Sequence, residues 1–309
     1  MYDIVIVGAG PAGLTAAIYA RRADKSVLVI EKENFGGQIT YSPKVENYPG
    51  SIQISGGELA EKFVEQALNL GAEIEMDTVL EIKNGDLKTI VGENGSYEAK
   101  SVILATGSKH RQLGLQNEND LIGNGVSYCA VCDGAFYNTQ TVAVIGGGNT
   151  ALQDAVLLSD MCKKVILIQN LDFFTGESTL LSLLGTKKNV EFITGCVVEK
   201  LFGDTHLSAI SIKNTSTGKI QNLDLDGIFV AIGQQPENEK FSDFVSLDEY
   251  GYIVADESCL TGTDGIFAAG DCRVKGVRQV ATAVADGAVS ALAACRYVDN
   301  LNYSSKNSI

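Results

Sequence analysis

Short apolar runs separated by glycine-rich turns mark the first thirty residues of the chain. An apolar run at Ile4–Val7 is followed by the turn GAGPAG at 8–13 and an alanine-rich helical stretch, Leu14–Arg22. A second apolar run, Ser26–Ile30, ends at the acidic residue Glu31. Continuous apolar runs of this length are typical of strands buried on both faces, as in a parallel sheet. The pattern therefore predicts a strand, a helix and a second, parallel strand.

The turn between the first predicted strand and helix has the spacing of a dinucleotide site. Gly8 permits a sharp turn, Gly10 lets the backbone approach a pyrophosphate, and Gly13 lets the helix pack closely on the strand. The start of the helix offers free N–H groups to phosphates, and Glu31 is placed to accept hydrogen bonds from a ribose. The alternative is a glycine turn that serves packing alone.

The same pattern returns at 141–169. Gly146, Gly148, Ala151 and Gln169 each lie 138 positions after their counterparts in the first pattern. One offset shared by four positions indicates a duplicated architecture, with two strand–helix–strand domains in one chain.

The second copy differs from the first where a coenzyme would be recognised. Gln169 replaces the acid that would hold the ribose of NAD, and NADP would require arginine for its 2′-phosphate. No arginine occurs between Arg111 and Arg273. We therefore expect the fold of a nucleotide domain here, with poor coenzyme contacts.

Composition places the chain among globular proteins. Its 309 residues are 45% hydrophobic and 20% charged, which fits about two domains of ordinary size. The formal charge of −14 argues against a general partner among nucleic acids or anionic membranes. No apolar run reaches the roughly 18 residues of a membrane span. The start of the chain shows no secretory pattern, so we expect a cytoplasmic protein.

Two of the seven cysteines form a CxxC pair, Cys129 and Cys132, followed directly by Asp133. Such a pair is half of a zinc site or a redox dithiol. The isolated histidines His110 and His206 and the lack of a second CxxC favour the dithiol, which exchanges with other disulfides. Asp133 would then supply a proton to a departing thiolate.

The remaining cysteines and His110 have a simpler interpretation. We interpret the five single cysteines as small buried apolar residues: Cys162, Cys196, Cys259, Cys272 and Cys295. His110 lies between Lys109 and Arg111 and is interpreted as a solvated residue of a linker.

Together these motifs resemble the low-molecular-weight thioredoxin reductases, which belong to the flavoproteins with two dinucleotide-binding domains. The resemblance covers nearly the whole chain. It rests on GAGPAG at 8–13, GGQ at 36–38, VENYPG at 45–50, ATG at 105–107, CAVCD at 129–133, GIFAAGD at 265–271 and RQVA at 278–281. The implied fold is α/β, with two Rossmann-like domains, the second inserted into the first. The implied limits are 1–112 with 243–309 for the FAD-binding domain, and 113–242 for the inserted NAD(P)-type domain.

The resemblance also implies the cofactor and the roles of the site residues. FAD would be held by residues of the first domain, with Asp271 bonding its ribityl chain. Cys132 would face the flavin, Cys129 would attack the disulfide of thioredoxin, and Asp133 would act as acid and base. The implied FAD contacts are Gly8, Gly10, Pro11, Ala12, Gly13, Glu31, Lys32, Gly37, Gln38, Asn47, Thr106, Gly107, Gly270, Asp271, Arg278, Gln279, Val280 and Ala281.

One departure from the family pattern affects the electron source. Members that use NADPH carry His-Arg-Arg directly after the second-domain strand and a further arginine beyond it. Here the corresponding positions are Gln169, Asn170, Leu171 and Thr175. Each lost charge-assisted hydrogen bond to phosphate is worth about 1.5–3 kcal/mol. The pattern instead resembles the ferredoxin-linked flavin thioredoxin reductases, so we expect reduced ferredoxin as donor and no binding of NAD(P)H.

Other functions stay open at this level. They are an ordinary NADPH-dependent thioredoxin reductase, an FAD-dependent dithiol oxidase and a non-enzymatic redox sensor. The expected partners are thioredoxin, ferredoxin and a second copy of the chain, joined through the FAD domains. Docking of an acidic ferredoxin would need basic residues, of which the candidates are Arg21, Arg22, Lys109, Arg111, Lys163, Lys164, Lys187 and Lys188.

Overall fold

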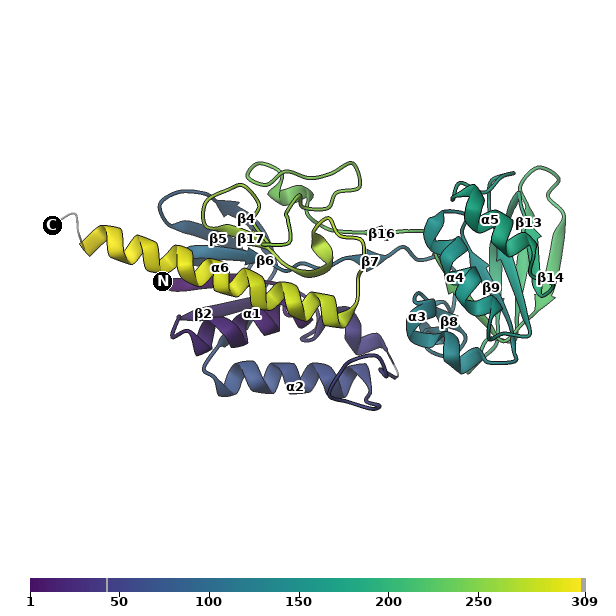
Figure 1. Cartoon of the computed structure of the whole chain (residues 1–309), viewed down its shortest axis with the longest axis horizontal. Coiled ribbons are helices and arrows are strands. Elements are labelled where there is room, and N and C mark those ends of the chain that lie inside the picture. The colour runs from purple at the N-terminus through teal and green to yellow at the C-terminus, as the bar shows by residue number, and fades with distance from the viewer. Residues whose placement is uncertain (43, 307–309) are drawn as a thin grey trace. The chain divides into compact units, whose positions relative to one another are not determined.

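The computed structural model of the chain describes residues 1–42 and 44–306. The chain forms two compact units (Figure 1). Unit 1 comprises Met1–Lys109 and Gln235–Ile309, and unit 2 comprises His110–Gln234. Unit 2 is thus inserted into the sequence of unit 1.

The chain passes between the units at two short strands. β7 (Lys109–His110) and β16 (Gln234–Gln235) pair as a two-stranded sheet. The sequence placed the second crossing at 242/243, whereas the segment from Gln235 onward belongs to unit 1. The reason is packing, because Phe241 of the short helix η4 (Glu239–Phe241) is fully buried in the core of unit 1.

Unit 1 is built on a seven-stranded sheet. Its strands are β1 (Tyr2–Val7), β2 (Val27–Glu31), β3 (Glu73–Met76), β4 (Val79–Lys83), β5 (Lys88–Gly92), β6 (Ser96–Leu104) and β17 (Ile266–Ala268). The order is β3-β2-β1-β6-β5-β4, with β17 pairing with β6. The strands β3, β2, β1, β6 and β17 are parallel, whereas β4 and β5 form an antiparallel extension on β6.

Helices cover one face of this sheet. They are α1 (Pro11–Arg22), α2 (Gly56–Asn69) and α6 (Val280–Lys306), with the short helices η1 (Gly37–Tyr41) and η5 (Gly270–Cys272) in the connections. Figure 1 shows α1 and α6 side by side, and the two pack closely. Because side chains alternate along a strand, Ile4 and Ile6 of β1 pack against the helices, and Val5 and Val7 fill the opposite face.

Unit 2 repeats this layered plan on a smaller scale. Its parallel sheet has the order β11-β10-β9-β15-β8, from β8 (Val126–Ser127), β9 (Thr141–Ile145), β10 (Lys164–Ile168), β11 (Val190–Ile193) and β15 (Gly227–Val230). The helices are α3 (Ala130–Asp133), α4 (Asn149–Ser159), α5 (Ser178–Gly185), η2 (Asn119–Leu121) and η3 (Gly134–Tyr137). A separate antiparallel sheet is formed by β12 (Cys196–Phe202), β13 (Ala209–Asn214) and β14 (Ile220–Asp224).

The two faces of the parallel sheet in unit 2 have different partners. Val142 and Val144 of β9 pack with residues of α4 and α5. Ala143 and Ile145 pack with residues of the antiparallel sheet. The predicted duplication of a strand–helix–strand unit is confirmed, since β1, α1 and β2 correspond to β9, α4 and β10.

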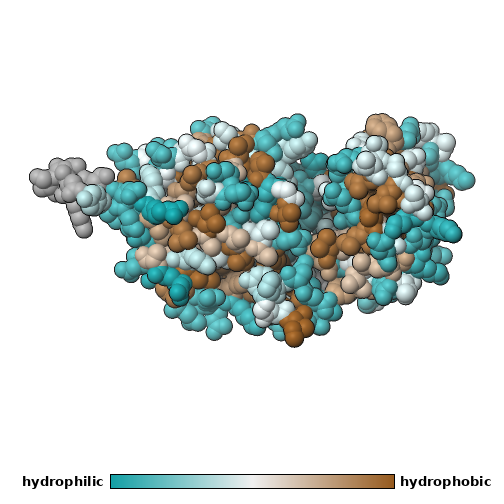
Figure 2. Space-filling model, in the orientation of Figure 1, coloured by the Kyte–Doolittle hydropathy of each residue, from teal (hydrophilic) through white to brown (hydrophobic). Residues whose placement is uncertain are grey.

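The surface mixes polar and apolar side chains. Figure 2 shows hydrophilic residues interspersed with smaller hydrophobic groups on the viewed face of each unit. Within residues 1–42 and 44–306, none of the helices is long and apolar enough to cross a lipid bilayer. The five single cysteines are buried, as predicted.

Candidate functional site

The glycine turn between β1 and α1 holds the backbone in a tight, open loop. Gly8 has a φ of 109°, and a Cβ there would lie 2.3 Å from the carbonyl oxygen of Ala105. A Cβ on Gly13 would lie 1.9 Å from the carbonyl oxygen of Gly8. Around Gly10, by contrast, a Cβ would meet no atom within 4 Å. The turn is therefore closely packed at Gly8 and Gly13 and open at Gly10. This open position, at the N-terminus of α1, suits a pyrophosphate.

Glu31 is held at the end of β2 by backbone donors. Its carboxylate accepts the N–H of Ala9 at 2.7 Å, and those of Lys32 and Glu33 at 2.9 Å. These bonds fix the carboxylate beside the glycine turn. A carboxylate has about four acceptor positions, so one position is left for a ribose hydroxyl.

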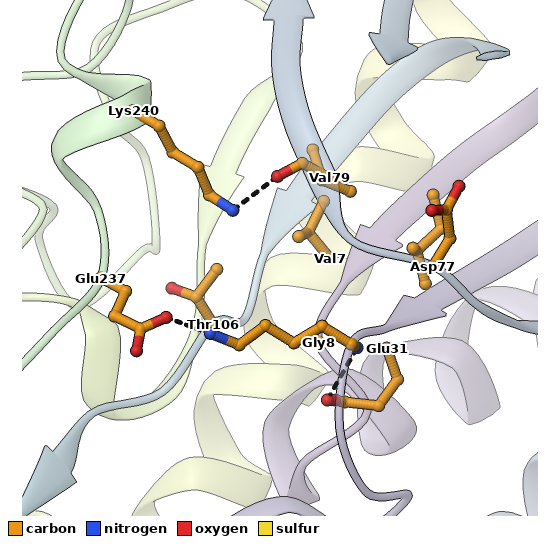
Figure 3. A pocket seen from close by; sticks show the side chains of 10 residues that line it. Val7, Gly8, Glu31, Asp77, Val79, Thr106, Glu237 and Lys240 are labelled. Atoms are coloured by element: carbon orange, nitrogen blue, oxygen red, sulfur yellow. Dashed lines mark hydrogen bonds and ion pairs between the residues drawn. The ribbon is translucent and has the colours of Figure 1, made fainter. Parts of the chain in front are cut away.

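A hollow of about 400 Å³, partly open to solvent, lies beside Glu31 (Figure 3). Its walls include Gly8 and Thr106. Lys240 donates to the carbonyl oxygen of Val79 at 2.6 Å. Burial lowers the pKa of Lys240 from its ordinary value. The hollow thus adjoins both the phosphate turn and the predicted ribose acceptor, as a site for the adenosine end of a dinucleotide requires.

Asp271 contributes an unsatisfied acceptor to unit 1. Its Oδ1 atom is buried and has no hydrogen-bond partner, and burial raises the pKa of Asp271 to about 6. The preceding Gly270 lies against α1, since a Cβ there would be 2.8 Å from the Cβ of Ala12. A buried acceptor with no partner is costly. Asp271 therefore fits the role of binding a sugar-alcohol hydroxyl of FAD.

A buried ionic cluster that the sequence did not reveal supports this loop. Asp286 of α6 accepts hydrogen bonds from the Nε and Nη2 atoms of Arg273, at 2.8 and 2.9 Å. It also accepts bonds from Nζ of Lys275 and from the N–H of Gly270, both at 2.9 Å. The available signal was an acid within the alanine-rich first half of the helix. The cluster ties α6 to the backbone directly before Asp271.

The other predicted FAD contacts lie in connections of the same unit. Gly37 and Gln38 open η1, Gly107 follows β6, and Val280 and Ala281 open α6. Two pairs of segments are joined: Asn47 donates to Oε1 of Gln279 at 3.2 Å, and Thr106 donates to Oδ1 of Asn238 at 2.8 Å. Arg278 stacks its guanidinium 4.0 Å from the centre of the Tyr252 ring, and Lys32 pairs with Glu237. Asn238, fully buried, is a further residue that the motifs did not identify.

The cysteine pair lies in unit 2, where β8 leads into α3. Cys129 and Cys132 form a disulfide, with their Cα atoms 5.3 Å apart. Asp133 ends α3 and accepts a hydrogen bond from Ser127 at 2.7 Å. Burial raises the pKa of Asp133, although the bond from Ser127 opposes this effect. A carboxyl that keeps its proton to higher pH is suited to acid catalysis near a disulfide.

His110 lies where the chain passes between the units, but it is half-buried and not solvated as expected. Its ring stacks on Tyr128, with the ring centres 5.3 Å apart, and burial lowers the pKa of His110 to about 4. Tyr128 in turn donates to the carboxylate of Glu118, which also accepts the N–H groups of Leu113 and Gly114. The polar sequence around His110 gave no sign of this packing, because Tyr128 belongs to a different segment, 18 positions further on.

Gln169 follows β10 and lies beside the glycine turn of the second copy, whereas Gly148, the counterpart of Gly10, is open, since the nearest atom to a Cβ there would be Oγ1 of Thr175 at 3.9 Å. The Nε2 atom of Gln169 lies 2.3 Å from where a Cβ of Gly147 would be. Gln169 is buried, and its side chain donates to the carbonyl oxygen of Phe173 and accepts the N–H of Asn170. The residue that would hold a ribose thus bonds to its own loop.

The loop after β10 closes on the same turn. Thr175 and Gly176 donate their N–H groups to the carbonyl oxygen of Gly147, at 2.8 and 2.9 Å. The N–H of Glu177 donates to the side chain of Asn149 at 2.8 Å, and this asparagine donates back to the Glu177 carboxylate. An acid therefore lies at the N-terminus of α4, where a coenzyme phosphate would need positive charge.

Comparison with known proteins decides the family. Residues 2–287 match the model of the pyridine nucleotide-disulphide oxidoreductases. The chain is 40% identical over 307 residues to a thioredoxin reductase of Peptoclostridium acidaminophilum, covering 97% of this chain and 98% of that protein. The chain belongs to the low-molecular-weight thioredoxin reductase family.

Further comparisons agree with this membership. The reductase is 41% identical over 298 residues to a 34.2 kDa protein in the rubredoxin operon of Clostridium pasteurianum, covering 96% of this chain and 97% of that protein. The crystal structure of thioredoxin reductase from Streptococcus pyogenes matches with a TM-score of 0.92 at 40% identity, covering 97% and 99% of the two chains. Family membership implies FAD as the cofactor, and the open turn and the unpartnered Asp271 fit it.

Asp271→Asn should separate cofactor binding from stability. The pKa of Asp271 is raised to about 6, so between about pH 4 and 6 the unfolded chain releases this proton while the folded chain retains it. Stability of the flavin-free protein therefore falls as pH rises through this window, and the loss persists at pH 7. The neutral variant should be about 3 kcal/mol more stable at pH 7 without flavin, and about tenfold weaker in binding FAD.

Chemical unfolding of the flavin-free proteins at pH 4 and pH 7 measures the first effect, and fluorescence titration with FAD measures the second. The two proteins should differ less in stability at pH 4. Equal stability of the parent and the variant at pH 7 would show that the folded structure does not disfavour the ionised form of Asp271.

Proposed function

We propose that this reductase receives single electrons from reduced ferredoxin and delivers them in pairs to the disulfide of thioredoxin through Cys129 and Cys132. Bound FAD supplies the conversion between one-electron and two-electron transfer. In the net reaction two ferredoxins are oxidised, two protons are taken up and one thioredoxin disulfide becomes a dithiol. The residues of unit 1 described above hold the cofactor, and Asp133 moves a proton at the cysteine pair.

Support for ferredoxin as donor comes from the nucleotide-type loop of unit 2. The Gln169 side chain bonds within its own loop and offers an amide where the first copy offers a carboxylate to a ribose. Leu171 and Thr175 stand where the resemblance calls for arginine, and Leu171 is exposed. This loop offers a nicotinamide coenzyme neither a guanidinium group for its phosphate nor a carboxylate at the end of β10 for its ribose. The affinity for the coenzyme should therefore be low. The similarity to a protein of a rubredoxin operon also fits an iron-protein donor.

Some of the candidate docking residues already form ion pairs or hydrogen bonds within the chain, and others are exposed. Lys109 pairs with Glu33 and Glu237, Lys164 pairs with Glu191 at 2.6 Å, and Lys187 pairs with Asp160 at 2.5 Å. Arg21 donates to the carbonyl oxygens of Leu70 and Lys25. The exposed residues Arg22, Arg111, Lys163 and Lys188 are better placed to meet an acidic ferredoxin. We therefore expect reduction by ferredoxin to slow as salt is added.

An anaerobic flavin titration tests the donor. Reduced ferredoxin should bleach the flavin absorbance rapidly, whereas NADPH and NADH at micromolar concentration should leave it nearly unchanged. The matched variant is Asn170→Arg/Leu171→Arg/Thr175→Arg, which restores phosphate-binding charge and should gain bleaching by NADPH. Rapid bleaching of the parent by NADPH would instead establish an NADPH-dependent thioredoxin reductase. Peroxide formation with a small dithiol, without thioredoxin turnover, would indicate a dithiol oxidase.

Assembly and location are part of the same proposal. We propose a homodimer through unit 1, because α6 exposes apolar Val289, Leu292 and Leu301, and the adjacent α1 exposes Tyr19. Sedimentation of the purified protein tests this. A cytoplasmic location stays a prediction, which fractionation of the source cells would check.

A further inference from the structure

A buried serine joins the acid and the cysteine pair of unit 2. Ser127 ends β8, which hydrogen-bonds to β15 in register with Phe229, and the serine is only 3% exposed. Its hydroxyl lies 2.7 Å from Oδ2 of Asp133 and accepts the N–H of Cys129 at 3.1 Å. One side chain thus contacts both the carboxyl group of Asp133 and the backbone of Cys129, which directly precedes α3.

The hydrogen-bond directions locate the acid proton. A serine hydroxyl has a single proton, and of its two acceptors, Oδ2 of Asp133 lies at 2.7 Å and the carbonyl oxygen of Cys129 at 3.4 Å. The shorter bond takes the proton, so Oδ2 acts as an acceptor. When Asp133 is protonated, its proton is therefore on Oδ1, which is buried and has no partner.

Two other titratable groups lie on elements that pack against α3, the helix that Asp133 ends. Tyr137 of η3 has its pKa raised to about 12 by burial and by Asp133, so it stays neutral in the working range. Asp154 lies on α4, which packs against α3, and burial raises its pKa to about 7. The pKa of Asp133 is raised by burial, and the hydrogen bond from Ser127 opposes this shift. Asp154 must therefore be tested separately.

We propose that Ser127 is a positioning residue for proton transfer at the cysteine pair. Its hydroxyl donates to Oδ2 of Asp133, so Oδ1 is the oxygen that gives or takes the proton. The same hydroxyl accepts the N–H of Cys129 and so holds the carboxyl group beside this cysteine. This role rests on the proposed function, in which Asp133 is the acid and base of the dithiol. It adds a residue that no motif singled out.

The step balances as follows in the direction of thioredoxin reduction. The thiol of Cys129 gives its proton to Oδ1 of Asp133, and the thiolate attacks one sulfur of the thioredoxin disulfide. That disulfide breaks, a mixed disulfide forms, and the other thioredoxin sulfur leaves as a thiolate. Oδ1 of Asp133 returns its proton to this thiolate and then takes the proton of the Cys132 thiol. The Cys132 thiolate attacks the Cys129 sulfur, the internal disulfide re-forms and the mixed disulfide breaks. The second thioredoxin sulfur takes the proton from Oδ1, so thioredoxin leaves as a dithiol.

The test is a single turnover followed across pH. The holoprotein is reduced with dithiothreitol, desalted without oxygen and mixed with an oxidised, tryptophan-containing thioredoxin. This chain contains no tryptophan, so the fluorescence reports thioredoxin alone. The parent rate should rise with pH as Asp133 ionises. Ser127→Ala removes a donor that stabilises the carboxylate, so the rising limb should move to higher pH and the rate on that limb should fall about tenfold.

Other variants separate positioning from general damage. Ser127→Thr, which keeps the hydroxyl, should restore most of the rate, and the dependence on thioredoxin concentration should be unchanged. Ser159→Ala is the matched control, because the hydroxyl of this buried serine of α4 donates to the carbonyl oxygen of Val156, within its own helix. Asp154→Asn should leave the rising limb of the pH–rate profile at the same pH as in the parent. In an Asp133→Asn background, Ser127→Ala should have no further effect.

A second measurement keeps this proposal distinct from the proposed function. Alkylation of the reduced protein by iodoacetamide reports the cysteine thiolate and requires neither thioredoxin nor ferredoxin. Its pH profile should carry the same inflection, because ionisation of Asp133 changes the thiol pKa. If the parent fails to reduce thioredoxin, the proposed function is wrong and alkylation still tests Ser127. Superimposable profiles for the parent and Ser127→Ala, or an equal shift in Ser159→Ala, would overturn the role of Ser127.

Discussion

Asp286→Ala is expected to lower the free energy of unfolding of unit 1 by about 3–5 kcal/mol, as removal of one partner from a buried ion pair does. Arg273 is 2% exposed and bonds both oxygens of Asp286. Lys275 donates to the same carboxylate. Without Asp286, two buried cations would face each other with only the exposed Glu257, 3.4 Å from Arg273, to compensate them. The loop that carries Gly270 would also lose its anchor, so FAD should bind more weakly.

The acid dependence of stability gives this prediction a second readout. Burial alone would raise the pKa of Asp286, but the hydrogen bonds from Arg273 and Lys275 outweigh it and the pKa is lowered. A lowered carboxyl pKa contributes stability that is present at neutral pH and is lost as the pH falls through the folded-state value. Asp286→Ala should remove that part of the acid sensitivity.

Denaturant unfolding of flavin-free and FAD-loaded protein measures the loss. Glu61→Ala, at an exposed position of α2, is the matched control and should change stability by less than about 0.5 kcal/mol. Arg273→Met together with Asp286→Leu, which removes both charges, should recover part of the stability. A loss below about 1 kcal/mol in Asp286→Ala would show that the cluster is not a buried ionic network in solution.

Cys129→Ser and Cys132→Ser should each abolish thioredoxin turnover, to the rate without enzyme. The two sulfurs are bonded to each other, and a serine oxygen can neither form nor exchange a disulfide. FAD binding should be unchanged in both variants, because the residues that fit the cofactor belong to unit 1 and the pair belongs to unit 2. Flavin absorbance and a thioredoxin-coupled thiol assay measure the two properties.

The two variants should also differ in whether they trap thioredoxin as a covalent complex. If Cys129 attacks thioredoxin, Cys132→Ser leaves a mixed disulfide that no second thiol resolves, and it should be isolated as a covalent complex. Cys129→Ser should form none. Cys162→Ser, at a buried single cysteine of the same unit, should retain turnover. The reverse trapping pattern would exchange the roles of the two cysteines.

Local patterns were sufficient to predict the elements around the glycine turns. The apolar runs and the spacing of Gly8 and Gly13 lie within some thirty residues, so they are readable from the chain, although the atom that crowds Gly8 belongs to the distant Ala105. The predicted helix began at Leu14, whereas α1 begins at Pro11, because proline at the first helical position lacks only an N–H that the helix does not use. The cysteine pair was equally local, since its members are three residues apart.

The sequence by itself determined that this protein has two related layered units, a glycine turn open to phosphate and a closely spaced cysteine pair, because each depends on neighbours along the chain. Only the tertiary structure decided which side chains complete these sites. Asn238 reaches Thr106 across 132 positions, and the carbonyl group of Ala105 packs against Gly8. Such contacts form when distant segments fold together, and no spacing within a single segment encodes them.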